Sequence, residues 1–285
     1  MGYYNVEKRD GYYAIYEPSN VFGYLIVGDK AAALIDTCYG YGDLNEVVRE
    51  ITDLPLIIIN THGHCDHTGG NAWFKDVPCY LNERDWDLAR EHCGSEFRRG
   101  DAELAKHAMN LKTQEEFNCL PENFDIDAYA AMGTGDLRPV HEGDTFDLGG
   151  VTLEIYETPG HTSGGISILH KEARRMFIGD AFSLHVWLFA PEATGRKSYI
   201  EMLNRMLNME ADEFIGGHYP FPMHKDIIPR YIQCAEEADY DKAMPFDVFF
   251  AKETNPRVYI IEGMTIKDFF DPQFASVVIS TDFDK

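Results

Sequence analysis

One short run of the sequence gathers side chains that bind metal ions. It contains three histidines and one aspartate within six positions: His62, His64, Asp66 and His67. Imidazole and carboxylate groups are the ligands that zinc and related metals take from proteins, and the run directly follows an apolar stretch at residues 56–60. Strand alternation puts His62 and His64 on one side, and a turn then lets Asp66 and His67 reach a second point. The spacing therefore favours two pairs of metal ligands over a histidine-rich surface loop.

Further candidate ligands occur later in the chain. Each follows an apolar run and stands beside a glycine, and they are His161, Asp180 and His218. The end of a strand is a rigid place from which a sheet can aim a side chain. With the first group, these residues give seven potential metal ligands.

The elements that must position these residues alternate between strands and helices. Apolar and β-branched runs predict the strands, and apolar residues spaced three and four apart predict the helices. Strands are expected at residues 12–17, 21–27, 31–35, 56–60, 144–148, 151–156, 166–169, 176–178, 214–215, 248–250 and 257–261, and helices at residues 43–52, 198–209 and 225–238. The order of strands and helices occurs twice, once before and once after residues 82–138. Two such halves predict an α/β fold, a sandwich of two sheets with helices outside.

No linker rich in proline, glycine or serine divides the chain, so we expect a single domain over residues 1–285. Residues 82–138 combine helix-forming stretches with turn residues, which predicts a helical insertion. Inserted segments often carry specificity, and this one is expected to be either a lid or a contact in a homodimer. Residues 240–285 are expected to form a C-terminal appendage.

The charge limits the partners. The chain has 285 residues, with 48 acidic and 25 basic side chains and a formal net charge of −23. Nucleic acids are bound through Lys and Arg, so no nucleic-acid partner is expected, and basic pairs such as Arg98-Arg99 and Arg174-Arg175 are expected on the solvated surface.

Neither a secretory signal nor an apolar run of ~18 residues is evident, which predicts a cytoplasmic protein without a membrane partner. The six scattered cysteines fit reduced thiols, and Cys65 is expected to be a small buried filler.

Taken together, the motifs resemble the metallo-β-lactamase superfamily of metal-dependent hydrolases, and in particular its glyoxalase II and lactonase-like binuclear branch. The H-x-H-x-D-H motif at residues 62–67, the later His161, the Gly-Asp at Asp180 and the Gly-His at His218 follow the family's order. Asp36, in Leu-Ile-Asp-Thr, also matches. The resemblance covers roughly residues 10–220. It implies a four-layer αββα sandwich with the site along one edge.

The resemblance also implies how two metal ions would be held. It assigns three ligands to each ion: His62, His64 and His161 to the first, and Asp66, His67 and His218 to the second. Asp180 would bridge the two ions, and Asp36 would support a ligand without binding metal. Two Zn²⁺ are the expected cofactors, with iron or manganese as alternatives.

The implied activity is hydrolysis of a small ester-like molecule, such as a thioester or a lactone, by a hydroxide that bridges two zinc ions. Asp66 would be catalytic, accepting a hydrogen bond from the nucleophile and carrying a proton to the leaving group. Side chains that follow the ligands closely are candidates for contact with substrate: His185, Trp187 and Tyr219.

Three alternatives remain open. A mononuclear iron oxidoreductase similar to persulfide dioxygenases would use His62, His161 and Asp180. A phosphodiesterase or RNA-processing nuclease is disfavoured by the acidic composition. A member that binds metal without catalysis is the third. The family name does not imply lactamase activity, because common zinc β-lactamases carry Cys where Asp180 stands.

Overall fold

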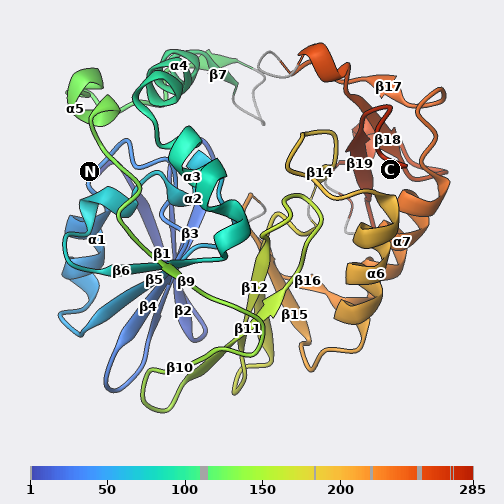
Figure 1. Cartoon of the computed structure of the whole chain (residues 1–285). Helices are drawn as coiled ribbons and strands as arrows, with labels where there is room; N and C mark the ends of the chain where they lie inside the picture. Colours follow the sequence, from blue (N-terminus) through green and yellow to red (C-terminus); the bar gives the residue numbers. More distant parts are fainter. Residues whose placement is uncertain are drawn as a thin grey trace. The chain divides into compact units, whose positions relative to one another are not determined.

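The structure is a computed structural model that describes residues 2–109, 115–182, 184–218, 221–248, 252–269, 271 and 273–284 (Figure 1). The chain divides into two compact units, Met1–Leu153 and Glu154–Lys285. The sequence patterns did not predict this division, because no linker marks the boundary.

The first unit is built on a seven-stranded sheet with the order β1-β2-β3-β4-β5-β6-β9. Its strands are β1 (Asn5–Arg9), β2 (Tyr12–Tyr16), β3 (Phe22–Val27), β4 (Ala32–Ile35), β5 (Leu56–Ile59), β6 (Pro78–Leu81) and β9 (Asp136–Pro139). Strands β1 to β4 pair antiparallel, and β4, β5, β6 and β9 pair in parallel. Parallel strands end at one edge of a sheet, which brings together the residues that follow β4 and β5.

Helix α1 (Leu44–Ile51) forms where the spacing predicts a helix and packs on this sheet (Figure 1). The side chain of Asp43 accepts a hydrogen bond from the Glu46 N–H and caps the first turn. Leu44 and Val48 lie on one face of α1 and are buried in the core under the sheet.

The segment expected as a helical insertion, residues 82–138, is helical over much of its length. It contains α3 (Trp86–His92), α4 (Ser95–Ala105) and α5 (Ile126–Ala130), after the 3₁₀ turn η2 (Glu83–Asp85). Two short strands, β7 (Ala108–Met109) and β8 (Glu116–Phe117), pair with each other. The end of the segment differs from expectation, because β9 joins the main sheet beside β6. Only Leu137 of this edge strand packs against the core, so no apolar pattern marked it.

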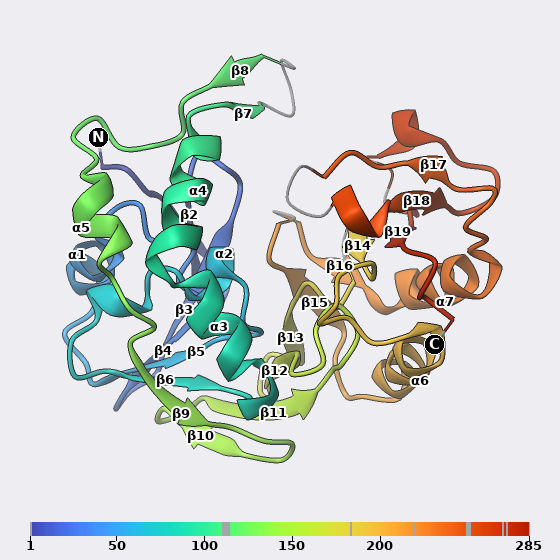
Figure 2. The same ribbon diagram turned by 45° about the horizontal axis from the view of Figure 1, so that its top comes forward.

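A six-stranded sheet has the strand order β10-β11-β12-β13-β15-β16. Its strands are β10 (Thr145–Asp147), β11 (Thr152–Glu157), β12 (Ile166–His170), β13 (Arg175–Gly179), β15 (Glu213–Gly216) and β16 (Met223–His224). Strand β10 and the start of β11 belong to the first unit by sequence, and the other strands belong to the second unit. Helices α6 (Arg196–Leu207) and α7 (Ile228–Glu237) lie side by side in both views (Figures 1 and 2). Tyr199 and Met206 of α6 share a buried cluster with Met176 and Phe214 of the sheet.

Residues 240–285, expected as an appendage, supply three strands of a second sheet in this unit. Its order is β14 (His185–Trp187), β19 (Ser276–Ile279), β18 (Arg257–Ile260) and β17 (Met244–Pro245). The 3₁₀ turns η3 (Lys225–Ile227), η4 (Lys252–Thr254) and η5 (Ile266–Asp268) complete the unit. Of the strand expected at residues 248–250, Val248 lies in no strand and the other two positions fall outside the described residues.

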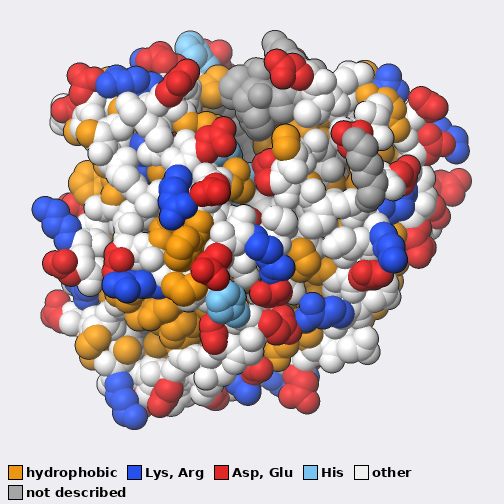
Figure 3. Space-filling view, viewed as in Figure 1, with side chains coloured by type: hydrophobic (Ala, Val, Ile, Leu, Met, Phe, Trp, Pro, Cys, Tyr) orange, Lys and Arg blue, Asp and Glu red, His pale blue; other side chains and the backbone are white. Residues whose placement is uncertain are grey.

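Acidic side chains are interspersed with basic ones on the face shown in Figure 3. Two arginines expected at the surface are buried instead, since Arg98 is 1% exposed and Arg175 is 8% exposed. Arg175 forms an ion pair with Glu213 at 2.7 Å, and Arg98 donates to backbone carbonyls. Among the described residues, no helix combines the length and apolar character needed to cross a bilayer.

Candidate metal centre

The first group of candidate ligands lies in a loop that leaves the end of β5. We call residues 62–69 the ligand loop. It contains one helical turn, α2 (Cys65–Thr68), which was expected only as a turn, and η1 (Asn71–Trp73) follows it. His62 and His67 are buried, whereas His64 and Asp66 are half-buried. Gly69 ends the loop where a Cβ would come within 2.2 Å of the Tyr39 carbonyl oxygen, so a side chain is excluded there.

The spacing of the ligand atoms in this loop suits a metal ion. The Nε2 atom of His62 lies 3.1 Å from Nδ1 of His64. The Nε2 atom of His67 lies 3.7 Å from Oδ2 of Asp66. Two ligands of one tetrahedral zinc, each about 2.0–2.2 Å from the ion, stand roughly 3.3 Å apart. Both pairs are close to that separation, and the donor set of nitrogen and oxygen atoms is one that zinc accepts.

Asp36 lies behind this loop, directly after β4. Its Oδ1 accepts a hydrogen bond from the Thr61 N–H at 2.7 Å, and its Oδ2 accepts one from the Thr61 hydroxyl at 2.8 Å. The same Oδ2 lies 2.8 Å from Nδ1 of His67. The carboxylate therefore fixes the His67 ring with Nε2 pointing away from Asp36.

The second unit holds the other three candidate ligands, each of which follows a strand. His161 comes after β11, Asp180 directly after β13 and His218 shortly after β15. Strands β13 and β15 are parallel neighbours, which places their ends together. The Oδ2 atom of Asp180 lies 3.8 Å from Nε2 of His161 and 3.2 Å from Nε2 of His218. This unit therefore also presents a carboxylate between two imidazoles at metal-ligand spacing.

His161 is oriented by a backbone carbonyl, as metal-binding histidines commonly are. Its Nδ1 lies 2.8 Å from the Trp187 carbonyl oxygen in β14. The Trp187 side chain packs against Phe189, with the ring centroids 5.5 Å apart. Trp187 thus contacts a candidate ligand through its backbone, a link that no motif in the sequence indicates.

The other candidates for substrate contact have different surroundings. The His185 ring lies among three aromatic side chains: Phe246, Phe269 and Phe274. Its Nδ1 lies 2.5 Å from Oγ of Ser276, and burial lowers the pKa of His185 to about 4. The ring is therefore neutral near pH 7. Tyr219 lies outside the described residues.

Sequence reasoning missed two buried carboxylic acids and one ring stack in the first unit. Burial raises the pKa of Glu17 to about 8 and that of Asp101 to about 7. His92 stacks on the candidate ligand His64, with ring centroids 5.1 Å apart. None of the three belongs to a motif, because each depends on contacts distant in sequence. Cys65 is buried as expected, and burial raises the pKa of its thiol.

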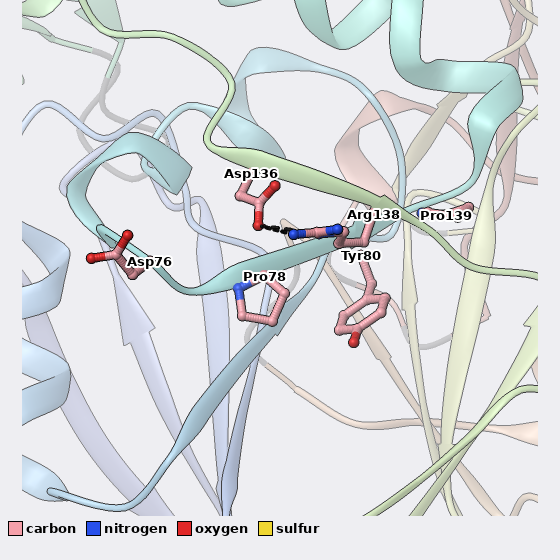
Figure 4. Close-up of a pocket in the computed structure, with 6 residues that line it drawn as sticks. All are labelled: Asp76, Pro78, Tyr80, Asp136, Arg138 and Pro139. Carbon is pink, nitrogen blue, oxygen red and sulfur yellow. Dashed lines mark hydrogen bonds and ion pairs between the residues drawn. The ribbon is translucent and has the colours of Figure 1, made fainter.

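A pocket elsewhere in the first unit has a different character. Six residues from the region of β6 and β9 line it: Asp76, Pro78, Tyr80, Asp136, Arg138 and Pro139 (Figure 4). Arg138 and Asp136 form an ion pair across 2.9 Å within it. Neither histidine nor cysteine lines it, so its side chains differ from those of the candidate ligand groups.

Comparison with known proteins identifies the family. The family model described as the metallo-beta-lactamase superfamily matches residues 16–218. Hydroxyacylglutathione hydrolase 1 of Vibrio vulnificus is 25% identical over 282 residues, which cover 92% of this chain and 93% of the relative. The acyl-coenzyme A thioesterase MBLAC2 of Gallus gallus is 24% identical, over 69% of this chain and 71% of the relative. The probable metallo-hydrolase YqgX of Bacillus subtilis is 28% identical over 57% of this chain, and the match spans 66% of YqgX, just under two thirds.

Solved structures agree on the fold. The DIM-1 metallo-beta-lactamase superposes with a TM-score of 0.58 at 17% identity, covering 83% of this chain and 98% of that protein. The sec-alkylsulfatase Pisa1 from Pseudomonas sp. gives a TM-score of 0.61 at 15% identity, over 81% of this chain and 41% of the sulfatase. The α/β metallo-β-lactamase fold expected from the sequence is confirmed. Because the family model spans residues 16–218 and so includes every candidate ligand, the chain belongs to the metallo-β-lactamase superfamily of metal-dependent hydrolases.

Proposed function

We propose that the chain is a binuclear zinc hydrolase that cleaves a small ester-like substrate, with a thioester as the first candidate and a lactone as the second. The proposed ligands come from both units: His62, His64, Asp66, His67, His161, Asp180 and His218. The observation that carries the proposal is the spacing of ligand atoms within each unit, 3.1 Å and 3.7 Å in the first and 3.2 Å and 3.8 Å in the second. Two relatives carry the names hydroxyacylglutathione hydrolase and acyl-coenzyme A thioesterase, which supports a thioester.

The chain's own residues supply binding and proton transfer. When bound, a pair of divalent ions lowers the pKa of water from 15.7 towards about 7 and polarises a carbonyl oxygen. Asp66 lies in the ligand loop beside His67, and its side chain is 17% exposed. Its carboxylate is therefore close to another candidate ligand and accessible to solvent. We assign it the role of accepting a proton from the attacking water and returning it to the leaving group.

Metal analysis and a substrate panel test the proposal together. The protein is purified without added metal, its metal content is measured, and a thioester, a lactone, an alkyl ester and a phosphodiester are assayed with and without a chelator. We expect two zinc ions per chain and chelator-sensitive cleavage of the thioester or the lactone. One iron ion per chain without hydrolysis would favour oxygen chemistry and contradict the proposal. Metal binding without turnover on any substrate would favour a non-catalytic member.

Asp180 gives a sharper test. Replacing it with alanine removes the carboxylate between His161 and His218, so we expect metal content and hydrolysis to fall together. Asp212→Ala makes the same charge change at an exposed position, where Asp212 pairs with Arg174, and should leave both unchanged. Full turnover with two metals in Asp180→Ala would rule out its proposed bridging role.

A further inference from the structure

We propose that residues 85–98, which run from the end of η2 into α4, hold the ligand loop in the shape that binds metal. We call them the support segment. This inference rests on the proposed function, because it takes residues of the loop to be metal ligands. It assigns positioning roles to Arg98 and His92, which no motif singled out, and it makes this part of the expected insertion a fixed support rather than a moving lid.

The first contact is made by Gly63, which stands in the sequence between the candidate ligands His62 and His64. The backbone N–H of Gly63 donates to Oδ2 of Asp85 at 3.0 Å, and Asp85 is 1% exposed. A Cβ on Gly63 would lie 2.7 Å from the Asp85 carbonyl oxygen. The support segment therefore touches the backbone of the ligand loop so closely that only glycine fits there.

The second contact is a column of three rings. The His92 ring stacks on His64, with centroids 5.1 Å apart and planes 15° from parallel. The Phe97 ring stacks on His92 in turn, with the ring centroids 4.1 Å apart and the planes 18° from parallel. Nearly parallel rings limit how far the His64 imidazole can turn about its side-chain bonds. The column therefore helps to keep Nδ1 of His64 directed at Nε2 of His62, 3.1 Å away.

The third contact holds the far end of the loop. Arg98 donates to the Gly69 carbonyl oxygen at 2.8 Å and to the Cys93 carbonyl oxygen at 3.1 Å. Its guanidinium lies over the Tyr129 ring, 4.6 Å from the centroid. The Gly69 N–H in turn donates to the Cys65 carbonyl oxygen at 2.7 Å and closes α2. Arg98 thus fixes the end of the helical turn that carries two candidate ligands.

The buried Arg98 side chain forms hydrogen bonds as well as packing contacts. The residue is 1% exposed, and its guanidinium donates to a carbonyl of the ligand loop, which a hydrophobic residue of similar length could not do. Partners that orient metal ligands from behind typically change metal affinity 10- to 100-fold when they are replaced. We expect effects of that size for the support segment.

The test compares Arg98→Met with Arg99→Met in the full chain. Arg99 is the next residue, but it is exposed and pairs with Asp127 at 2.7 Å, which makes it a matched control. Each protein is stripped of metal and titrated with Co²⁺ against a chelating indicator, and its visible spectrum is recorded. We expect Arg98→Met to bind Co²⁺ 10- to 100-fold more weakly with altered visible bands, and Arg99→Met to match the unsubstituted protein.

His92 provides a second comparison if Arg98→Met does not fold. His92→Phe keeps a ring against His64 and should bind Co²⁺ as the unsubstituted protein does, whereas His92→Leu removes the ring and should bind more weakly. Affinity and spectra unchanged in both Arg98→Met and His92→Leu, or in His92→Leu alone when Arg98→Met is unfolded, would overturn the inference. An unsubstituted protein that binds metal but hydrolyses nothing contradicts only the proposed function. One that binds no metal contradicts both.

Discussion

At the scale of single residues, Asp36 combines a strained backbone conformation with contacts to a candidate ligand. Its backbone has φ of +58°, a left-handed conformation that is uncommon outside glycine but better tolerated by aspartate. The conformation turns the chain at the end of β4 so that one carboxylate reaches both Thr61 and His67. The resemblance to the family suggested a supporting residue here, but the partner that it supports became visible only in the structure.

Asp36→Asn tests that role. The amide N–H₂ would face donors at Thr61 or His67, so the His67 ring should lose its fixed orientation. We expect zinc affinity to fall about 10- to 100-fold, measured by competition with a chelator. Asp53→Asn, at an exposed position, is the control. Unchanged affinity in Asp36→Asn would show that His67 does not need this partner.

Glu17 makes a prediction about pH. It is fully buried, accepts a hydrogen bond from the Gly40 N–H at 3.2 Å, and has its pKa raised by burial from 4.5 to about 8. Between these values the folded protein keeps a proton that the unfolded chain has released. The contribution to stability is therefore complete below pH 4.5 and is lost as the pH rises towards 8, at up to ~1.4 kcal/mol per pH unit.

The neutral variant Glu17→Gln should lose this dependence. We expect its free energy of unfolding, from urea denaturation at several pH values between 5 and 8, to fall less steeply with pH than that of the unsubstituted protein. Glu46→Gln, on the exposed face of α1, should keep the original slope. Equal slopes in Glu17→Gln and the unsubstituted protein would mean that Glu17 is ionised in the folded state.

At the scale of elements, the sequence predicted those with a strong local pattern. Helix α1 and strands β2 to β5 lie where apolar spacing placed them, because each buries one face or both. Strand β9 was missed because it is an edge strand with one side chain against the core, and β14 because it spans only His185–Trp187. The candidate ligands were recognised from their types and spacing, whereas their supporting contacts depend on tertiary packing that no local pattern encodes.

Strand β14 has a consequence for the second group of ligands. It pairs in parallel with β19, where Trp187 lies opposite Val278, and its Trp187 carbonyl orients His161. Val278→Pro should disturb this pairing and lower zinc affinity about 10-fold, which competition with a chelator would measure. Val258→Pro disturbs the pairing of β18 with both β17 and β19 but changes no residue of the β14–β19 pair, so it controls for lost stability. Equal zinc affinity in the two folded variants would contradict the prediction.

At the scale of the whole molecule, the formal charge of −23 affects which substrates approach. Like charges repel over about 10 Å at 0.1 M salt and less at higher salt. For a multiply anionic thioester we expect kcat/KM to rise several-fold between 10 and 200 mM NaCl, as the repulsion is screened. A neutral thioester with the same acyl group should change little. A fall in kcat/KM for the anionic substrate would instead indicate local attraction at the site.

The pairing of β14 with β19 also sets an order of events while the chain is being made. His185 in β14 pairs with a residue 91 positions further along, so β14 has no partner until that stretch has been translated. At 5–20 residues per second this delay is roughly 5 to 20 seconds. The contacts between the ligand loop and its support segment lie within residues 62–98, and Tyr129, whose ring packs against Arg98, follows only 31 residues later. We therefore expect a nascent chain to complete its first group of candidate ligands before its second, because the strand that orients His161 pairs only after residue 276.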